Sequence, residues 1–231
     1  MRLLRSTLDL FFPPLCLSCS KRLKGNETLL CLTCLAKLEW LEGVCSVCGN
    51  EIKNKHCRYC SSQHIYFDKV RSLFHFNSVV QSLIHNLKYN ETTIVSNFLK
   101  SYFEIYLNSY DPFEKIDLIS PVPLHAVRKR ARGYNQAELL SGKIAKILDT
   151  EHIPQLIKRK KYTKSQTQLN KAERDNNVES AFILNNKFDI SNKNILLVDD
   201  VFTTGSTVNS ISKLLKENNC NKVFVLSIAH A

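Results

Sequence analysis

The sequence has 231 residues, enough for one α/β domain and a small additional module. Its 32 Lys and Arg residues against 21 Asp and Glu residues give a formal net charge of +11, which favours polyanionic partners. No apolar run reaches the ~18 residues of a membrane span, and the opening segment MRLLRSTLDLFFPPLC is interrupted by Asp9 and ended by Pro13 and Pro14, so we expect neither a span nor an export signal.

Eight of the nine cysteines lie in four Cys-x-x-Cys pairs near the start of the chain. Without a secretion route these thiols are expected to be reduced, and four thiolates suit a tetrahedral structural Zn²⁺. Two structural zinc ions are therefore predicted, whereas redox dithiols or disulfides fit four evenly distributed pairs less well. Pairing in sequence order gives one ion to the first four cysteines and one to the last four, but interleaved pairing is left open. The eight predicted ligands are Cys16, Cys19, Cys31, Cys34, Cys45, Cys48, Cys57 and Cys60.

Residues 1–64 are predicted to form this small double zinc-ribbon module, and residues 65–231 a larger α/β domain. The first segment has few apolar runs, so metal binding has to stabilise its fold. After Ile65, strand-like and helix-like segments alternate, which predicts a parallel sheet with ligands at its carboxyl edge. The predicted strands span residues 70–76, 117–121, 195–198 and 222–229, and the predicted helices span residues 79–89, 94–107, 135–148 and 208–215.

The segment from Ile157 to Asn177 has neither helix nor strand periodicity. A loop of this length inside a compact domain is usually a functional lid or a disordered segment. We interpret it as a lid over a binding site, or as a nucleic-acid contact. Its basic residues are Lys158, Arg159, Lys160, Lys161, Lys164, Lys171 and Arg174.

The stretch ILLVDDVFTTGSTV, from Ile195 to Val208, combines an apolar strand, two carboxylates, a hydroxyl-rich turn and a helix start. Backbone N–H groups and the helix dipole at such a turn hold an anion. Asp199 and Asp200 would repel a bare phosphate, so the ligand should also carry hydroxyls or a metal ion. The alternative is an ordinary strand-turn-helix unit with a polar cap.

This stretch resembles the phosphoribosyl-pyrophosphate (PRPP) motif of type I phosphoribosyltransferases, whose parts all occur here in order. The resemblance implies that Asp199 and Asp200 accept hydrogen bonds from the ribose hydroxyls, and that Mg²⁺ bridges the sugar and the pyrophosphate. The residues implied to wrap the 5′-phosphate are Thr203, Thr204, Gly205, Ser206 and Thr207.

The chain as a whole is similar to the ComF/GntX family of competence-related proteins. The similarity rests on FFPPLCLSC, LKY, PVPLHAVRKRARGYNQAELL and TKSQTQLNKAERDNNVESAF, in this order with the Cys-x-x-Cys pairs. It implies a type I phosphoribosyltransferase-like parallel sheet with helices on both faces, preceded by a zinc-ribbon module. It also implies a cytoplasmic protein that handles incoming single-stranded DNA in natural transformation, with this DNA and a helicase of the uptake machinery or another competence protein as partners.

In such a fold, the loop after the strand that ends at Pro121 faces the pyrophosphate. Arg130 and Arg132 are the candidate pyrophosphate contacts, and Gly133 permits a close turn. Many relatives continue past the last strand into a hood that binds the base, whereas this sequence stops at Ala231. We therefore expect an acceptor pocket from the segment between Tyr66 and Phe113, or from the zinc module.

Three hypotheses about function follow. The first is a PRPP-dependent transferase with an unknown acceptor, and the second is a catalytically inactive nucleic-acid-binding protein that keeps the PRPP site as a sensor or structural element. The third is an interaction protein whose zinc module docks a partner. We favour a PRPP-binding competence protein whose catalytic residues are unknown. Basic residues beyond those that PRPP needs are expected to contact DNA, with Tyr134 or Tyr162 stacking on bases; they are Arg128, Lys129, Lys158, Arg159, Lys160 and Lys161.

Overall fold

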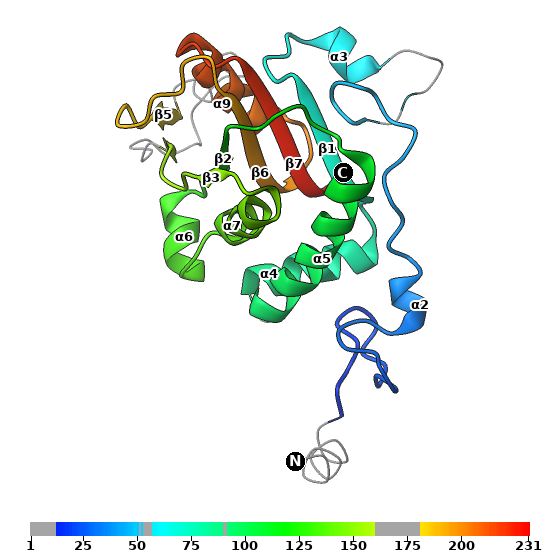
Figure 1. The fold of residues 1–231 in the computed structure, drawn as a ribbon. Helices are drawn as coiled ribbons and strands as arrows, with labels where there is room; N and C mark the ends of the chain where they lie inside the picture. Colours follow the sequence, from blue (N-terminus) through cyan, green and yellow to red (C-terminus); the bar gives the residue numbers. More distant parts are fainter. Residues whose placement is uncertain (1–12, 51, 53–56, 90–91, 160–180) are drawn as a thin grey trace, which may run out of the picture.

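The computed structural model describes residues 13–50, 52, 57–89, 92–159 and 181–231 (Figure 1). Its centre is a five-stranded parallel sheet in the order β1-β7-β6-β2-β3. The strands are β1 (Lys69–His75), β2 (Leu118–Pro121), β3 (Glu151–His152), β6 (Asn194–Phe202) and β7 (Lys222–His230). A separate antiparallel pair consists of β4 (Ile157–Arg159) and β5 (Phe182–Leu184).

Helices cover both faces of the sheet, as predicted (Figure 1). One face carries α4 (Ser78–Tyr89), α5 (Thr92–Tyr110) and α7 (Gln136–Leu148), whose buried side chains share a core with Leu196 and Val198 of β6. The other face carries α9 (Ser206–Glu217), which packs on the alternate residues Ile195 and Leu197. This alternation is the period-2 pattern of a strand buried on both sides. The other helices within the described residues are α2 (Leu32–Leu35), α3 (Arg58–Ser62) and α6 (Ala126–Arg132).

The central strand β6 is longer than its apolar run predicts. We expected a strand that ends at Val198, but the β6–β7 ladder continues to Phe202, with Asp199 opposite Ser227. The ladder persists because β7 runs beside it as a partner as far as His230. Both acidic residues therefore lie within a strand, and the turn begins only after Phe202.

Several short elements were not predicted, since each is too short for a periodic signal. Helix α6 and strand β3 are among them, and strand β4 occupies the first three residues of the segment interpreted as a lid. The rest of that segment as far as residue 177 lies outside the described residues, and this includes Lys160, Lys161 and Tyr162. No helix in the described part of the chain is long and apolar enough to cross a lipid bilayer.

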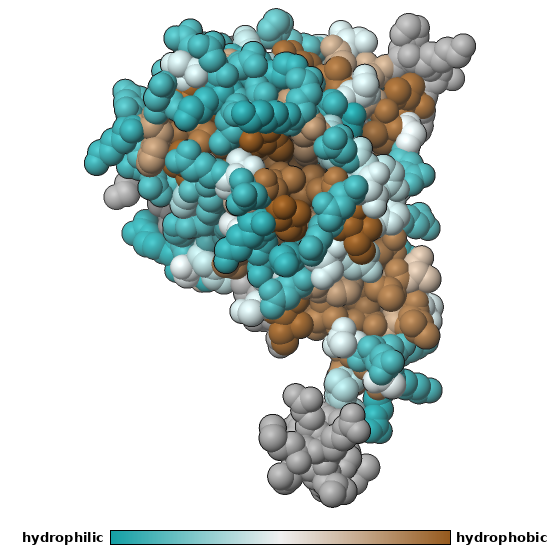
Figure 2. Space-filling model, viewed as in Figure 1, coloured by the Kyte–Doolittle hydropathy of each residue, from teal (hydrophilic) through white to brown (hydrophobic). Residues whose placement is uncertain are grey.

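The cysteine-rich segment contacts the sheet domain at two separate places. Its first part packs against α5 through Trp40, whose ring lies 5.2 Å from that of Phe74 and 5.9 Å from that of Tyr106. Figure 2 shows apolar side chains gathered between α2 and α5, where this contact is made. Its second part lies on β1, where the backbone N–H of Val70 donates to the carbonyl of Val47 at 2.7 Å. A boundary at residue 64 stays a prediction, because the two parts share cores with the sheet domain.

Candidate functional site

Two adjoining cavities open at the carboxyl edge of the sheet, where β6 meets α4 and α9. The larger has a volume of about 500 Å³ and the smaller about 160 Å³. Both are lined by Lys88, Asp199, Asp200 and Thr207. The predicted acidic pair therefore forms the wall that the two cavities share.

The acidic pair is held by groups from both neighbouring helices. Lys88, near the end of α4, forms an ion pair with the Oδ2 atom of Asp200. Gln136, the first residue of α7, donates from Nε2 to the same Oδ2 atom at 3.2 Å. The Oδ1 atom of Asp199 accepts the backbone N–H of Asp200 at 2.8 Å. These bonds fix both carboxylates against the strand.

The pKa values of the two carboxyl groups are shifted in opposite directions, because Lys88 forms its ion pair with Asp200. Burial and the neighbouring charge of Asp200 raise the pKa of Asp199 well above its usual value. Burial alone would also raise the pKa of Asp200, but the ammonium group of Lys88 and the bond from Gln136 lower it. Asp200 is therefore the more acidic member of the pair, while an incoming cation near Asp199 would favour the ionised form of that carboxyl group.

The hydroxyl-rich turn follows β6 and leads into α9. Gly205 adopts a left-handed conformation, with φ at +66°, and caps the helix. The hydroxyl groups of Thr204 and Ser206 lie 3.1 Å apart. The first N–H groups of a helix have no partner within the helix, so this turn presents donors and a positive dipole end to a phosphate. Thr203 lines the larger cavity, while Thr207 lines both.

The two predicted pyrophosphate contacts lie at different places on α6. Arg132 lines the smaller cavity and donates to the Tyr89 hydroxyl at 3.0 Å. Arg130 is an exposed residue of the same helix and is not among the residues that line this cavity. Gly133 ends α6 with φ at +80°, so the close turn expected there is present. The roles of both arginines in binding pyrophosphate stay predictions.

Sequence reasoning missed three residues of this site. Lys88 lies in the LKY stretch and Gln136 in the PVPLHAVRKRARGYNQAELL stretch that carry the family similarity, but neither was expected to contact the acidic pair. Arg159 was grouped with a basic segment expected to contact DNA, but the structure places it in the smaller cavity, with its guanidinium over the ring of Phe182. The hydroxyl of Tyr134 donates to the carbonyl of Leu87 at 2.6 Å, and its role in stacking on bases stays a prediction.

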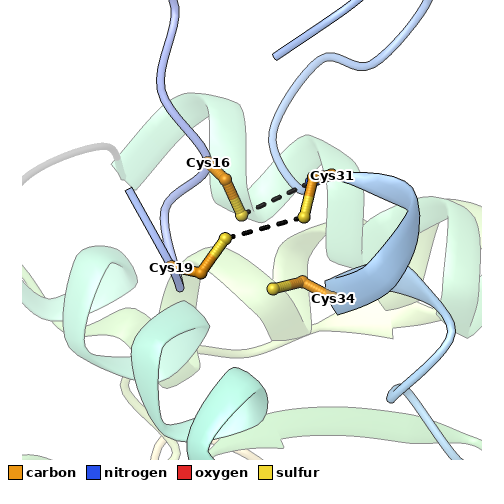
Figure 3. A group of neighbouring side chains, drawn as sticks. All are labelled: Cys16, Cys19, Cys31 and Cys34. Atoms are coloured by element: carbon orange, nitrogen blue, oxygen red, sulfur yellow. Dashed lines mark hydrogen bonds between the residues drawn. The ribbon is translucent and has the colours of Figure 1, made fainter. Parts of the chain in front are cut away.

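Eight cysteines form two groups of four, each with its sulfur atoms within 4.8 Å of one another. Figure 3 shows the first group, in which the four thiols point toward a common centre. Sulfur atoms around a tetrahedral zinc ion lie about 3.8 Å apart, close to the 3.6 Å between Cys19 and Cys31 and the 3.8 Å between Cys45 and Cys60. The donor set therefore fits zinc. The grouping selects the sequential pairing over the interleaved one.

Each group contains one thiol that ionises readily. Burial of Cys16 opposes ionisation, but backbone N–H groups directed at its sulfur lower its pKa to about 6. The same balance lowers the pKa of Cys45 to about 7. Burial and the neighbouring thiols raise the pKa of Cys34 to about 12. Cys16 and Cys45 are thus the thiols of their groups whose ionisation the backbone favours, and a thiolate is the form that binds a metal ion.

We predict two zinc ions per chain, measured by elemental analysis of the purified protein. The variants Cys16→Ser/Cys19→Ser and Cys45→Ser/Cys48→Ser should each retain one ion. Since a structural zinc ion contributes about 10–16 kcal/mol, chelation should unfold the cysteine-rich module and spare much of the sheet. One ion or none in the wild type, with all thiols freely titratable, would refute this prediction.

We also predict that Lys88→Met raises the pKa of Asp200, because its burial is then uncompensated. The change should destabilise the fold by about 1–3 kcal/mol at neutral pH. This destabilisation should shrink as the pH falls through the raised pKa, since Asp200 then takes up a proton. NMR titration of the carboxyl carbons and unfolding by urea check both effects. Lys100→Met, which removes the exposed ion-pair partner of Glu104, is the control and should leave the pKa of Asp200 unchanged.

Comparison with known proteins places this architecture in a family. A double zinc ribbon domain model matches residues 7–63, and a phosphoribosyl transferase domain model matches residues 135–230. Competence protein F of Haemophilus influenzae is 32% identical over 227 residues, which cover 96% of this chain and 99% of that protein. Competence protein ComFC of Bacillus subtilis is 28% identical over 204 residues, which cover 84% of this chain and 80% of that protein.

DNA utilization protein YhgH of Escherichia coli K12 is 26% identical over 218 residues, which cover 92% of this chain and 95% of that protein. Among solved structures, adenine phosphoribosyltransferase from Saccharomyces cerevisiae matches 59% of this chain and 69% of its own, with 18% identity and a TM-score of 0.40. The predicted fold class, a type I phosphoribosyltransferase-like sheet preceded by a zinc-ribbon module, is confirmed. The chain belongs to the ComF family of competence proteins.

Proposed function

We propose that this protein binds PRPP together with Mg²⁺ at the carboxyl edge of its sheet and serves the handling of single-stranded DNA in natural transformation. The observation that carries the proposal is one wall of side chains shared by two cavities. On this wall, the acidic pair of β6 lies beside the hydroxyl-rich turn that leads into α9, a kind of turn that suits a phosphate. PRPP carries hydroxyls, a phosphate and a diphosphate on one molecule, and so calls for both kinds of group at once.

Each part of PRPP has a counterpart among these residues. Asp199 and Asp200 are acceptors for the 2′- and 3′-hydroxyls, and the turn from Thr203 to Thr207 offers N–H and hydroxyl donors to the 5′-phosphate. The smaller cavity contains two guanidinium groups, from Arg132 and Arg159, and these suit the diphosphate. Two adjacent carboxylates also supply the hard oxygen ligands that Mg²⁺ takes, and a bound Mg²⁺ would neutralise part of the diphosphate charge.

The larger cavity provides space for an acceptor. Its wall includes Phe76, whose exposed fraction is 42%, and Tyr89, whose exposed fraction is 57%. The rings of His85 and Tyr89 lie 5.0 Å apart on the same helix. These residues belong to the segment between Tyr66 and Phe113 that was expected to supply an acceptor pocket. Flat apolar walls with a few polar groups suit a planar ring, so we place the acceptor here.

Replacing both Asp199 and Asp200 with Asn should weaken the binding of Mg²⁺-PRPP about 10-fold or more, because each charge-assisted hydrogen bond is worth roughly 1.5–3 kcal/mol. Calorimetric titration of the zinc-loaded protein measures this effect. Asp189→Asn/Asp149→Asn, a matched pair on loops away from the site, is the control and should bind as the wild type does. No binding by the wild type, or unchanged affinity in the Asp199/Asp200 variant, would overturn the PRPP assignment.

Diphosphate release separates an enzyme from a sensor. The protein is incubated with PRPP, Mg²⁺ and a panel of nucleobases, and diphosphate is measured over time. If diphosphate is released only when one particular nucleobase is present, the protein is a transferase and that base is its acceptor. Binding of PRPP without release supports the alternative, in which the site acts as a sensor or a structural element of a nucleic-acid-handling protein.

A concentration of positive charge on α7 supports the contact with DNA. Burial, and after it the like charges of Lys100 and Lys146, lower the pKa of Lys143, whose ammonium group donates to Asn97 at 2.6 Å. Lys143, Lys146 and Lys129 line a groove of about 620 Å³ on the surface beside α6. A phosphate backbone is a polyanion that would neutralise these like charges, and one relative is named a DNA utilization protein.

Changing Lys143 and Lys146 to Ser should therefore weaken the binding of single-stranded DNA and flatten its dependence on salt. The slope of log K against log salt should fall in magnitude by roughly 0.7 for each phosphate group that the variant no longer neutralises. Lys115→Ser/Lys187→Ser removes the same charge from two exposed sites elsewhere and is the matched control. Equal slopes for the two variants, measured by fluorescence anisotropy over a salt series, would show that the groove is only a solvated basic surface.

A further inference from the structure

We propose that Tyr59 is a positioning residue for the phosphate-binding turn, and that the second cysteine group thereby stabilises the ligand-binding form of this turn. Tyr59 lies in α3, between the predicted zinc ligands Cys57 and Cys60. The inference rests on the proposed function, because it concerns the same PRPP site. It extends that function by making one zinc ion part of the binding site.

A direct hydrogen bond joins the zinc module to the turn. The hydroxyl of Tyr59 donates to the backbone carbonyl of Thr204 at 3.0 Å, across 145 residues of sequence. Thr204 immediately precedes Gly205, the residue whose left-handed conformation starts α9. The bond therefore holds the peptide that orients the first N–H groups of the helix.

The turn and the tyrosine fit closely. A Cβ atom added to Gly205 would lie 2.1 Å from the Tyr59 hydroxyl and 2.7 Å from the ring of Phe202. Glycine is therefore required at position 205 for two reasons. The Tyr59 hydroxyl and the Phe202 ring leave no space for a side chain, and the backbone has a positive φ. The Tyr59 ring itself lies against Phe67, 6.5 Å away and nearly parallel, and against the edge of Phe202 at 6.1 Å. Rings on two sides thus restrict the movement of the phenol.

The second cysteine group determines the position of Tyr59. Helix α3 has only five residues, too few to be stable by its own hydrogen bonds. The thiols of Cys57, which caps α3, and of Cys60, within α3, lie close to those of the other Cys-x-x-Cys pair. The sulfur atoms of Cys48 and Cys57 are 3.2 Å apart, and those of Cys45 and Cys60 are 3.8 Å apart. Ligation of one ion by all four would therefore fix the position from which Tyr59 reaches the turn.

A second contact links the same cysteine group to the site. Asn50 donates from Nδ2 to the sulfur of Cys48 at 3.5 Å, and its Oδ1 atom lies 2.6 Å from Nε2 of His230. The ring of His230 is 4.9 Å from that of Phe202, which also contacts Tyr59. The second cysteine group is thus connected to the last residues of β6 and β7, next to the turn, by two sets of contacts: one through Tyr59 and one through Asn50 and His230.

The test compares Tyr59→Phe with the wild type in the zinc-loaded full-length protein. Tyr110→Phe is the matched control, since its hydroxyl donates to Glu42 at 3.2 Å and Tyr110 lines neither of the two cavities. Three probes are titrated: Mg²⁺-PRPP, ribose 5-phosphate and inorganic diphosphate. Removal of the hydrogen bond to Thr204 should weaken the first two by about 2- to 10-fold. Diphosphate, which needs only the cationic cavity, should bind unchanged, and zinc content should stay at the wild-type value.

Amide hydrogen exchange of the peptide that spans residues 203–208 supplies a readout without ligand. Exchange should be faster in Tyr59→Phe than in the wild type or in Tyr110→Phe. Equal exchange and equal ribose 5-phosphate affinity in all three proteins would show that Tyr59 is only a packed aromatic residue. A parallel decrease of affinity for diphosphate would point to general destabilisation and also overturn the inference. If the wild type does not bind PRPP, the proposed function fails, while the exchange rates still decide the role of Tyr59.

Discussion

The arrangement of the site depends on the cost of placing two carboxyl groups side by side at the end of a buried strand. Such a pair is tolerated only if a cation and further donors compensate it, because an unpaired buried charge is expensive. Lys88 supplies the cation from α4, and Gln136 supplies a donor from the first turn of α7. Helix α4 in turn is held by five buried apolar residues of its inner face. The packing of α4 and α7 against the sheet therefore holds Lys88 and Gln136 where they compensate the acidic pair at the end of β6.

The two cysteine groups stabilise the small cysteine-rich segment. A segment of this size buries too little apolar surface to fold alone, so it relies on metal ligation and on contact with a larger domain. The first group shares a core with the helices α4 and α5, and the second shares one with β1, β6 and α9. The segment is thus anchored at two places on the sheet domain.

Elements with strong periodicity could be predicted from the sequence. The helix predicted over residues 79–89 corresponds to α4, which buries five apolar residues of one face. The eight cysteines form the two groups of four that sequential pairing predicts. Contacts between segments far apart in sequence could not be predicted. Nothing local in α4 shows that Lys88 meets Asp200, and Arg159 looks like part of a basic run until the pairing of β4 with β5 turns it toward the cavity. The length of β6 was missed for the same reason, since its partner strand decides it.

The position of Trp40 gives the protein an internal optical reporter. It is the single tryptophan of the chain, and its ring lies among Phe74, Tyr102 and Tyr106, where the first cysteine-rich part meets the sheet domain. Its emission spectrum therefore responds to separation of this part from α5, because that separation would transfer the indole from aromatic surroundings into water. Undocking of the metal-binding segment can thus be followed in real time without any label.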